Sequence, residues 1–248
     1  MPDKVDIFGV PVDNVTMDEA LARAVELAQG DGCSYAVTPN AEMIYAAMHN
    51  PAVKAALCGA DLILPDGAGV VMAAKKLKRP LKEKVAGIVF GEKLLPLLAE
   101  RGLSLFILGC QPGVALTAAD RLTVKYPGLI IVGVRDGFSD HSEDVAAVNA
   151  AGCDVLYIAM GAPYSELWMA ENKDKVCAKF MVALGGSIDY YAGIVKRTPA
   201  IFIKLRLEWF HRLCKQPSRI KRMTALPKFM SAIRKQARLE RRAARKQA

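Results

Sequence analysis

Asp66 is the residue of this sequence best placed to do chemistry. It follows the apolar run Leu62–Leu64 and precedes Gly67 and Gly69, where a helix is predicted to begin. Aspartate is a frequent N-cap, so its carboxylate could simply hold the start of that helix. A carboxylate at the carboxyl end of a parallel strand also points into the ligand crevice, where it can act as a general base. Both roles stay open at this point.

The residues that follow the other predicted strands are also small or polar. Thr38 and Asn40 could form hydrogen bonds with a sugar or a phosphate. Glycines let a ligand approach the backbone, and nearby helix N-termini offer N–H groups to an anion. The strand exits are Thr38–Asn40, Pro65–Gly67, Gly109–Gly113, Arg135–Gly137, Gly161–Pro163 and Gly185–Ser187. Each alone is an ordinary turn, but six together favour a phosphate-bearing ligand.

Several familiar chemistries lack their sequence motif. There is no GxxxxGK[ST] loop, no GxSxG elbow, and no GxGxxG after the first predicted strand. The three histidines lie far apart, without metal-ligand spacing, and the six cysteines are scattered without a CxxC pair, so we expect reduced thiols. The sequence therefore predicts neither a metal site nor a bound cofactor.

The elements that must position these residues alternate along the chain. Short β-rich apolar runs are separated by helical patterns, which predicts an α/β, Rossmann-like fold with a mostly parallel sheet and helices on both faces. The predicted strands are Val5–Val10, Tyr35–Thr38, Leu62–Leu64, Ser104–Leu108, Leu129–Val134, Val155–Met160 and Phe180–Leu184. Helices are predicted after Thr16, which has capping-box spacing to Glu19, and over about Ala41–Cys58, Gly67–Leu77, Gly91–Arg101, Val114–Lys125, Glu143–Ala151 and Ser165–Asn172.

The net charge of +9 is concentrated at the C-terminus. Residues 196–248 hold 17 Lys and Arg against 2 acids, whereas residues 1–195 carry a net charge of −6. We therefore divide the chain into a body, residues 1–195, and a basic C-terminal appendage, residues 196–248. This asymmetry is typical of proteins that dock on phosphate-rich material, although a solubilising tail is the plainer interpretation.

The appendage is predicted to be helical and amphipathic. Pro199 can open a first helix, which Pro217 ends. Further on, apolar residues repeat at helical spacing among Arg and Lys, as in a helix lying on a membrane surface or on a partner: Leu226, Phe229, Met230, Ile233 and Ala237. No apolar run reaches the ~18 residues that span a bilayer, and the N-terminus lacks signal-peptide features, so we expect a cytoplasmic protein.

Taken in order, these motifs resemble those of the WecG/TagA/CpsF glycosyltransferases (glycosyltransferase family 26). The similar stretches, from residue 5 to about residue 222, are Thr38–Glu42, Leu64–Val70, Val85–Gly87, Leu108–Gly109, Tyr126–Pro127, Asp136–Phe138, Gly161–Pro163, Gly185–Asp189, Ala192–Gly193, Arg197–Pro199 and Leu207–Leu213, with Pro217 and Arg219. The resemblance implies an inverting, metal-independent transfer of an N-acetylmannosamine-type sugar from a UDP donor. It also implies a polyprenyl-diphosphate-linked N-acetylglucosamine acceptor at the cytoplasmic membrane face, in cell-surface polysaccharide synthesis.

The resemblance also implies roles for particular residues. Asp66 matches the catalytic base, Thr38 and Asn40 line its pocket, and three arginines of the appendage, Arg212, Arg219 and Arg222, match residues that complete the active site. Further substrate-binding positions are Lys84, Gly109, Asp136, Gly161, Ser165, Glu166, Gly185, Gly186 and Asp189. The chain departs from the usual pattern at Tyr164-Ser165 (usually Lys-Gln), Lys84 (usually Arg) and Val89 (usually Asp). The identity of the sugar therefore does not follow from the motifs.

Two alternatives stay open. One is an S-adenosylmethionine-dependent methyltransferase that uses the Gly109–Gly113 loop and binds nucleic acid through the basic appendage. The position of the loop argues against this alternative, because at least three predicted strands come before the strand that the loop follows. In addition, the second helical stretch of the appendage offers only Phe229 for base stacking. The other is a non-catalytic surface-binding relative, suggested by Ser165 and Val89. We expect a UDP-sugar, the polyprenyl-linked lipid and an anionic membrane surface as partners, and no nucleic acid; a homo-oligomer stays open.

Overall fold

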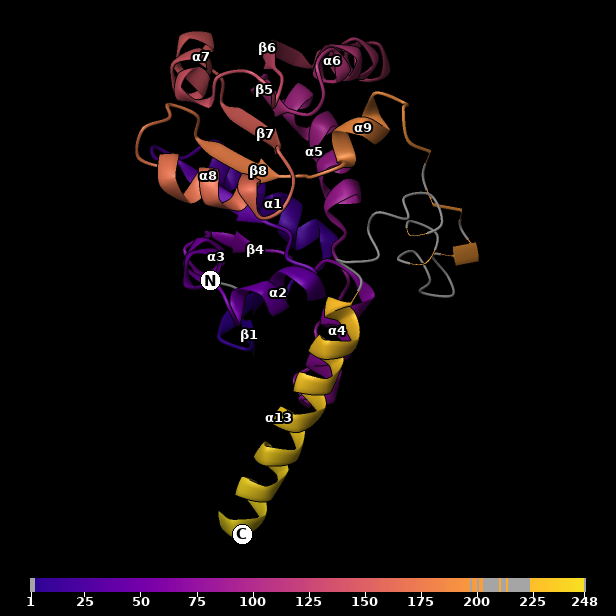
Figure 1. The fold of residues 1–248 in the computed structure, drawn as a ribbon. Helices are drawn as coiled ribbons and strands as arrows, with labels where there is room; N and C mark the ends of the chain where they lie inside the picture. Colours follow the sequence, from indigo (N-terminus) through magenta and orange to yellow (C-terminus); the bar gives the residue numbers. More distant parts are fainter. Residues whose placement is uncertain are drawn as a thin grey trace.

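A six-stranded parallel sheet forms the centre of the computed structural model (Figure 1), which describes residues 3–196, 198–199, 201–202, 210, 213 and 224–247. The strands lie in the order β4-β3-β8-β7-β5-β6, and every neighbouring pair is parallel. They are β3 (Ser34–Val37), β4 (Leu62–Ile63), β5 (Ser104–Gly109), β6 (Ile130–Arg135), β7 (Val155–Ala159) and β8 (Phe180–Ala183). The predicted α/β class and the parallel sheet are confirmed.

Helices cover both faces of the sheet. One face carries α1 (Met17–Ala28), α5 (Gly87–Glu100), α6 (Val114–Lys125) and α9 (Ser187–Tyr191). The other carries α2 (Ala41–Ala47), α3 (Pro51–Cys58), α4 (Ala68–Lys76), α7 (Asp144–Ala151), which follows the short 3-10 helix η1 (His141–Glu143), and α8 (Tyr164–Asn172). The predicted capping box of α1 is present, since Thr16 and Glu19 each accept a hydrogen bond from the other's backbone N–H.

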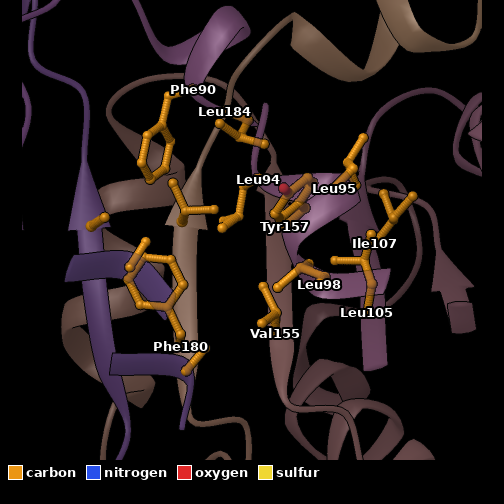
Figure 2. Close-up of a cluster of buried hydrophobic side chains, with 14 of the residues drawn as sticks. Phe90, Leu94, Leu95, Leu98, Leu105, Ile107, Val155, Tyr157, Phe180 and Leu184 are labelled. Atoms are coloured by element: carbon orange, nitrogen blue, oxygen red, sulfur yellow. The ribbon is translucent and has the colours of Figure 1, made fainter. Parts of the chain in front are cut away.

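Helix α5 is held in place by a cluster of buried apolar side chains (Figure 2). Leu94 and Leu98 pack toward the strand residues Ile107, Tyr157 and Phe180, and all five side chains are fully buried. The Tyr157 hydroxyl donates to the Gly91 carbonyl at 2.9 Å, so this buried polar group is satisfied. The apolar contacts leave α5 little freedom to shift, which fixes the position of its first turn.

Two predicted elements are each divided into two in the structure, and the helix predicted from Gly91 begins earlier, at Gly87. The predicted strand Val5–Val10 is a separate antiparallel hairpin of β1 (Lys4–Ile7) and β2 (Val10–Asp13), because the two-residue turn Phe8–Gly9 reverses the chain with both φ angles positive. The predicted helix Ala41–Cys58 is split into α2 and α3. Asn50 caps α3 by accepting from the N–H groups of residues 52 and 53, and Pro51 occupies its first turn.

The second helix of the appendage is present as α13 (Ala225–Gln247), but its apolar face has a different neighbour from the one predicted. Phe229 and Ile233 are fully buried against the body, where α13 packs on α2 and α4. The rings of Phe8 and Phe229 meet edge to face, with centroids 5.9 Å apart. This face is therefore part of the core and not a face that a membrane could cover. The far end of α13 extends beyond the body (Figure 1).

Two further expectations concern the appendage and the membrane. Most of the predicted helix after Pro199 lies outside the described residues, as do the candidate site residues Arg212, Arg219 and Arg222. Among the helices that the structure does describe, none has both the length and the apolar character needed to cross a bilayer.

Candidate active site

The connections that follow the neighbouring strands β3 and β8 diverge at the carboxyl end of the sheet. The chain leaves β3 toward α2 on one face, and it leaves β8 toward α9 on the other. Such a divergence of neighbouring connections is where open α/β sheets bind ligands. The Thr38 hydroxyl links the ends of these two strands, donating to the Ala183 carbonyl at 3.4 Å. Asp66 follows β4, one strand farther along.

The backbone of the Asp66 turn is tied to α5. The Val85 N–H donates to the Pro65 carbonyl at 3.0 Å, and the Gly87 N–H donates to Asp66 Oδ2 at 3.3 Å. Asp66 does not cap its own helix, because Gly67, with φ +83°, is the N-cap of α4. The half-buried carboxylate lies instead at the N-terminus of α5, where the helix dipole favours a negative charge.

Gly87 lets the first turn of α5 come close to Thr38. A Cβ at this position would lie 2.9 Å from Thr38 Oγ1 and 3.1 Å from Thr38 Cγ2, tighter than ordinary side-chain contacts. Only a residue without a side chain fits against Thr38 here. The motif Val85–Gly87 was part of the sequence resemblance, but the sequence did not indicate a role in the site for any of its three residues.

Asn40 lies beside the same turn. A Cβ at Gly67 would be 3.7 Å from Asn40 Cβ, so Thr38, Asn40 and Asp66 are brought together around two glycines. The Asn40 side chain is the N-cap of α2, accepting from the Met43 N–H at 3.0 Å. Its amide group is therefore held in place, with Oδ1 engaged by the helix.

The exits of β7 and β8 are open glycine turns. Gly161 and Gly185 have φ of +84° and +50°, and a Cβ at either would meet no described atom within 4 Å. Their backbone conformation requires glycine, and the space beside them is accessible to a ligand. Gly186 is close to the carboxylate of Asp189, since a Cβ added there would lie 3.6 Å from Asp189 Oδ2. These turns follow β8, which is the neighbour of β3, and β7, which is the next strand along.

Ser165 and Glu166 follow the Gly161 turn in the chain. Both are almost completely buried in the first turn of α8. Ser165 Oγ accepts from the Met160 N–H at 3.1 Å and donates to the Gly161 carbonyl at 3.4 Å. Ser165 therefore shapes the glycine turn. Lys84 lies half-buried in the loop that enters α5.

Gly109 and Asp136 lie at the ends of β5 and β6, in the half of the sheet away from β4 and Asp66. A Cβ at Gly109 would lie 2.6 Å from the Ala159 carbonyl carbon, so this glycine permits close packing. Asp136 accepts from the Phe138 N–H at 2.9 Å and from the Ser139 hydroxyl at 3.0 Å, and these bonds hold the pKa of Asp136 below its ordinary value. Asp136 follows β6 and Asp66 follows β4, the two edge strands, about 24 Å apart at ~4.8 Å per strand. The structure does not bring these two carboxylates together.

Leu226 is a neighbour of the site that the sequence did not indicate. A Cβ at Gly69, three residues after Asp66, would lie 2.8 Å from Ala41 Cβ and 3.3 Å from Leu226 Cδ1. The first turn of α13 thus abuts α4, the helix that follows Asp66. Helical periodicity predicted an apolar face for α13, but no local signal says which surface such a face will cover.

The sequence profile described as "Glycosyl transferase WecG/TagA/CpsF family" matches residues 5–243, from β1 into the outer part of α13. The chain belongs to the WecG/TagA/CpsF family. The resemblance found in the motifs is thereby confirmed, and the protein is a glycosyltransferase rather than the methyltransferase of the first alternative.

Several bacterial WecG/TagA/CpsF proteins are similar over most of their length. A protein of Bacillus spizizenii is 36% identical over 206 residues, which cover 83% of this chain and 80% of that one. One of Staphylococcus aureus (strain MRSA252) is 31% identical over 236 residues, 94% of this chain and 92% of that one, and one of Bacillus subtilis (strain 168) is 31% identical over 200 residues, 80% and 78%. All three are named N-acetylglucosaminyldiphosphoundecaprenol N-acetyl-beta-D-mannosaminyltransferase.

Proposed function

We propose that this glycosyltransferase moves N-acetylmannosamine from a UDP donor to N-acetylglucosamine carried on a polyprenyl diphosphate, in the synthesis of a cell-surface polymer. The names of the three relatives support both the sugar and the lipid acceptor. The observation that carries the chemistry is the position of Asp66, held at the N-terminus of α5 close to Thr38 and Asn40.

In this proposal Asp66 is the base of an inverting, metal-independent reaction. Its carboxylate takes the proton from the acceptor hydroxyl, whose oxygen bonds to the anomeric carbon while the bond from that carbon to the diphosphate breaks. UDP leaves with the electron pair. The backbone N–H groups of the glycine turns, Lys84, and the appendage arginines Arg212, Arg219 and Arg222 would stabilise the leaving charge.

The lipid acceptor places the enzyme, in this proposal, at the inner face of the membrane. Because the apolar face of α13 is buried, attachment would depend on charge. Exposed basic side chains occur on the outer face of α13 and at the end of α4: Lys228, Arg234, Lys235, Arg238, Arg241, Arg242, Lys75, Lys76 and Lys78. Each basic residue near an anionic leaflet contributes about 1 kcal/mol, so several suffice for reversible docking.

Calorimetry tests the donor half of the proposal. UDP, UDP-N-acetylmannosamine and S-adenosylmethionine are titrated separately into the full chain with a chelator present. We expect both uridine nucleotides to bind without metal and S-adenosylmethionine not to bind. The proposed donor would be ruled out if neither uridine nucleotide gave a binding isotherm.

A further inference from the structure

A groove of about 810 Å³ lies beside α13, away from the strand exits. Its walls come from the β1–β2 turn, the end of α2, the start of α3 and the middle of α13. We call it the α13 groove. No residue predicted to be in the site lines it, so its chemistry has to be considered separately.

The α13 groove has an apolar lining that is open to solvent. Met48 and Leu239 line it with 38% and 55% of their surface exposed, and the other apolar lining residues are Phe8, Ala47, Pro51 and Ala232. Leu239 stands out because the residues around it on α13 are mostly charged. One exposed apolar side chain is common on protein surfaces, but here several from different elements line the same depression.

Phe8 is held at the groove in an unfavourable backbone conformation. Its φ is +57°, in the left-handed region that bulky residues avoid, and it occupies a turn position where asparagine or glycine is usual. The packing of its ring on Phe229 offsets this cost. Strain that is maintained in this way is found where a fold needs a particular side chain in a particular place.

Two lysines add positive charge to the groove. Lys54 Nζ lies against the hairpin turn, 2.6 Å from where a Cβ of Gly9 would be, and Lys235 lines the groove from α13. The one acid in the lining, Asp6, is oriented toward the turn, accepting from the Gly9 N–H at 3.2 Å. An apolar lining beside two cations suits an amphiphile that has an apolar chain and an anionic head.

The groove lies at a defined distance from Asp66. Helix α2 leads from Asn40, beside Asp66, to Met48 in the groove, about 12 Å at 1.5 Å per residue. Helix α13 leads from Leu226, beside Gly69, to Lys235 in the groove, about 14 Å by the same rise. In a polyprenyl-linked acceptor, one hexosamine and a diphosphate separate the reacting hydroxyl from the first isoprene unit, and an extended group of that size bridges such a distance.

We propose that the α13 groove binds the first isoprene units of the lipid acceptor, with Lys54 and Lys235 next to its diphosphate. This inference rests on the proposed function and adds a lipid subsite to it. The rest of the polyprenyl chain would continue into the membrane.

A pair of acceptors tests the subsite. Met48→Gln/Leu239→Gln is compared with wild type on N-acetylglucosaminyl diphosphate linked to farnesol and on the same diphosphate linked to methanol. We expect the KM for the farnesyl acceptor to rise about tenfold, with kcat, the donor KM and the KM for the methyl acceptor unchanged. The control, Val124→Gln, removes an 83% exposed apolar side chain on α6 and should change none of these values. An unchanged farnesyl KM, or an equal rise with both acceptors, would overturn the proposal.

The lysines should give a different signature. Lys54→Gln/Lys235→Gln should raise the KM for both acceptors alike, because both contain the diphosphate. Lys93→Gln, which removes an exposed lysine on α5, is its matched control. Equal KM values for the lysine variant and wild type would remove these two residues from the subsite.

Direct binding separates this inference from the proposed function, because it needs no turnover. Farnesyl diphosphate should bind the wild-type chain and bind Met48→Gln/Leu239→Gln about tenfold more weakly. If it does so but neither acceptor is glycosylated, the subsite stands and the proposed function fails. If transfer occurs but wild type and the variant bind farnesyl diphosphate equally, the subsite is contradicted and the proposed function stands. Displacement of farnesyl diphosphate by a short-chain phosphatidylglycerol at the same concentration would assign the groove to membrane lipid and contradict the proposal.

Discussion

Gly87 sets how closely the first turn of α5 approaches Thr38 and Asp66. Helix propensity alone predicts that Gly87→Ala stabilises the protein by up to about 1 kcal/mol. The 2.9 Å separation between a Cβ at this position and Thr38 Oγ1 predicts the opposite, because Thr38 or α5 must move. We expect a lower melting temperature and a kcat reduced about tenfold, measured by thermal unfolding and by a transfer assay.

A second substitution distinguishes crowding from a general defect. Gly87→Ala/Thr38→Ser removes the Cγ2 methyl and frees the hydroxyl to rotate, so part of the lost kcat should return. A Gly87→Ala variant that is more stable and fully active would show that α5 does not need this approach to position Asp66.

For single residues, the sequence predicted well which positions lie close together. It predicted less well what each side chain does there. Thr38, Asn40 and Asp66 do lie together, because the carboxyl ends of parallel strands share one edge of the sheet. Asn40 and Ser165, expected to bind substrate, have oxygens engaged in hydrogen bonds to the protein backbone. Motif spacing identifies such residues, but the neighbour that uses each hydrogen bond is known only once the loops are placed.

Helix α13 is the element whose environment departs most from expectation. Because Phe229 is fully buried against the body, Phe229→Ala should lower the free energy of unfolding by about 3–5 kcal/mol. Leu239→Ala, on the same helix but 55% exposed, should change it by no more than about 0.5 kcal/mol. Chemical denaturation measures both. A Phe229→Ala variant as stable as wild type would mean that α13 detaches from the body in solution.

The starts of β5 and β7 are tied by Asp154. Its Oδ2 accepts from the Ser104 N–H at 2.9 Å and from the Ser104 hydroxyl at 2.8 Å. Partial burial acts to raise the pKa of Asp154, but these hydrogen bonds and the charge of Lys179 outweigh it, so the pKa lies below its ordinary value. The folded state therefore binds this proton more weakly than the unfolded state does.

The stability that this carboxylate contributes should be present above its ordinary pKa of about 3.9 and be lost as the pH falls below it. Denaturation curves recorded between about pH 5 and pH 3 should show a decreasing free energy of unfolding, and Asp154→Asn should flatten that slope. A slope that is the same in the variant would show that other carboxylates carry the acid sensitivity.

The order of strands and helices along the chain was predictable from the sequence, but the contacts between elements far apart in the sequence were not. The alternation of strands and helices and the Thr16–Glu19 cap are both present, because each depends on local periodicity or spacing. The β1–β2 hairpin was missed because Phe8 is not a usual turn residue and only its contact with Phe229, 221 positions away, explains it. The partner of the apolar face of α13 depends on the same kind of long-range contact.

For the whole molecule, the burial of the apolar face of α13 makes the basic surface the feature on which membrane attachment would depend. Since the helix cannot insert that face, binding to anionic vesicles should depend on charge. Arg238→Gln/Arg241→Gln/Arg242→Gln removes three exposed cations, worth about 1 kcal/mol each near an anionic leaflet. We expect vesicle sedimentation to show affinity falling by roughly 100-fold, and the wild-type affinity to fall as salt rises.

The matched control removes three exposed basic residues from the body instead of from the appendage, Lys93→Gln/Arg101→Gln/Lys175→Gln. It changes the net charge equally and should leave vesicle binding near the wild-type value. If both triple variants lose binding to the same extent, total charge and not the surface of α13 governs attachment.

Transfer by the purified full chain and by Asp66→Asn is the most direct test of the account. UDP-N-acetylmannosamine and a polyprenyl diphosphate carrying N-acetylglucosamine are incubated with each protein and a chelator, and the lipid product is followed by mass spectrometry and NMR. We predict that wild type adds one N-acetylhexosamine with inversion, whereas Asp66→Asn adds none and keeps its affinity for UDP within a few-fold. Transfer by Asp66→Asn at the wild-type rate, or a wild-type chain that forms no product, would contradict the account.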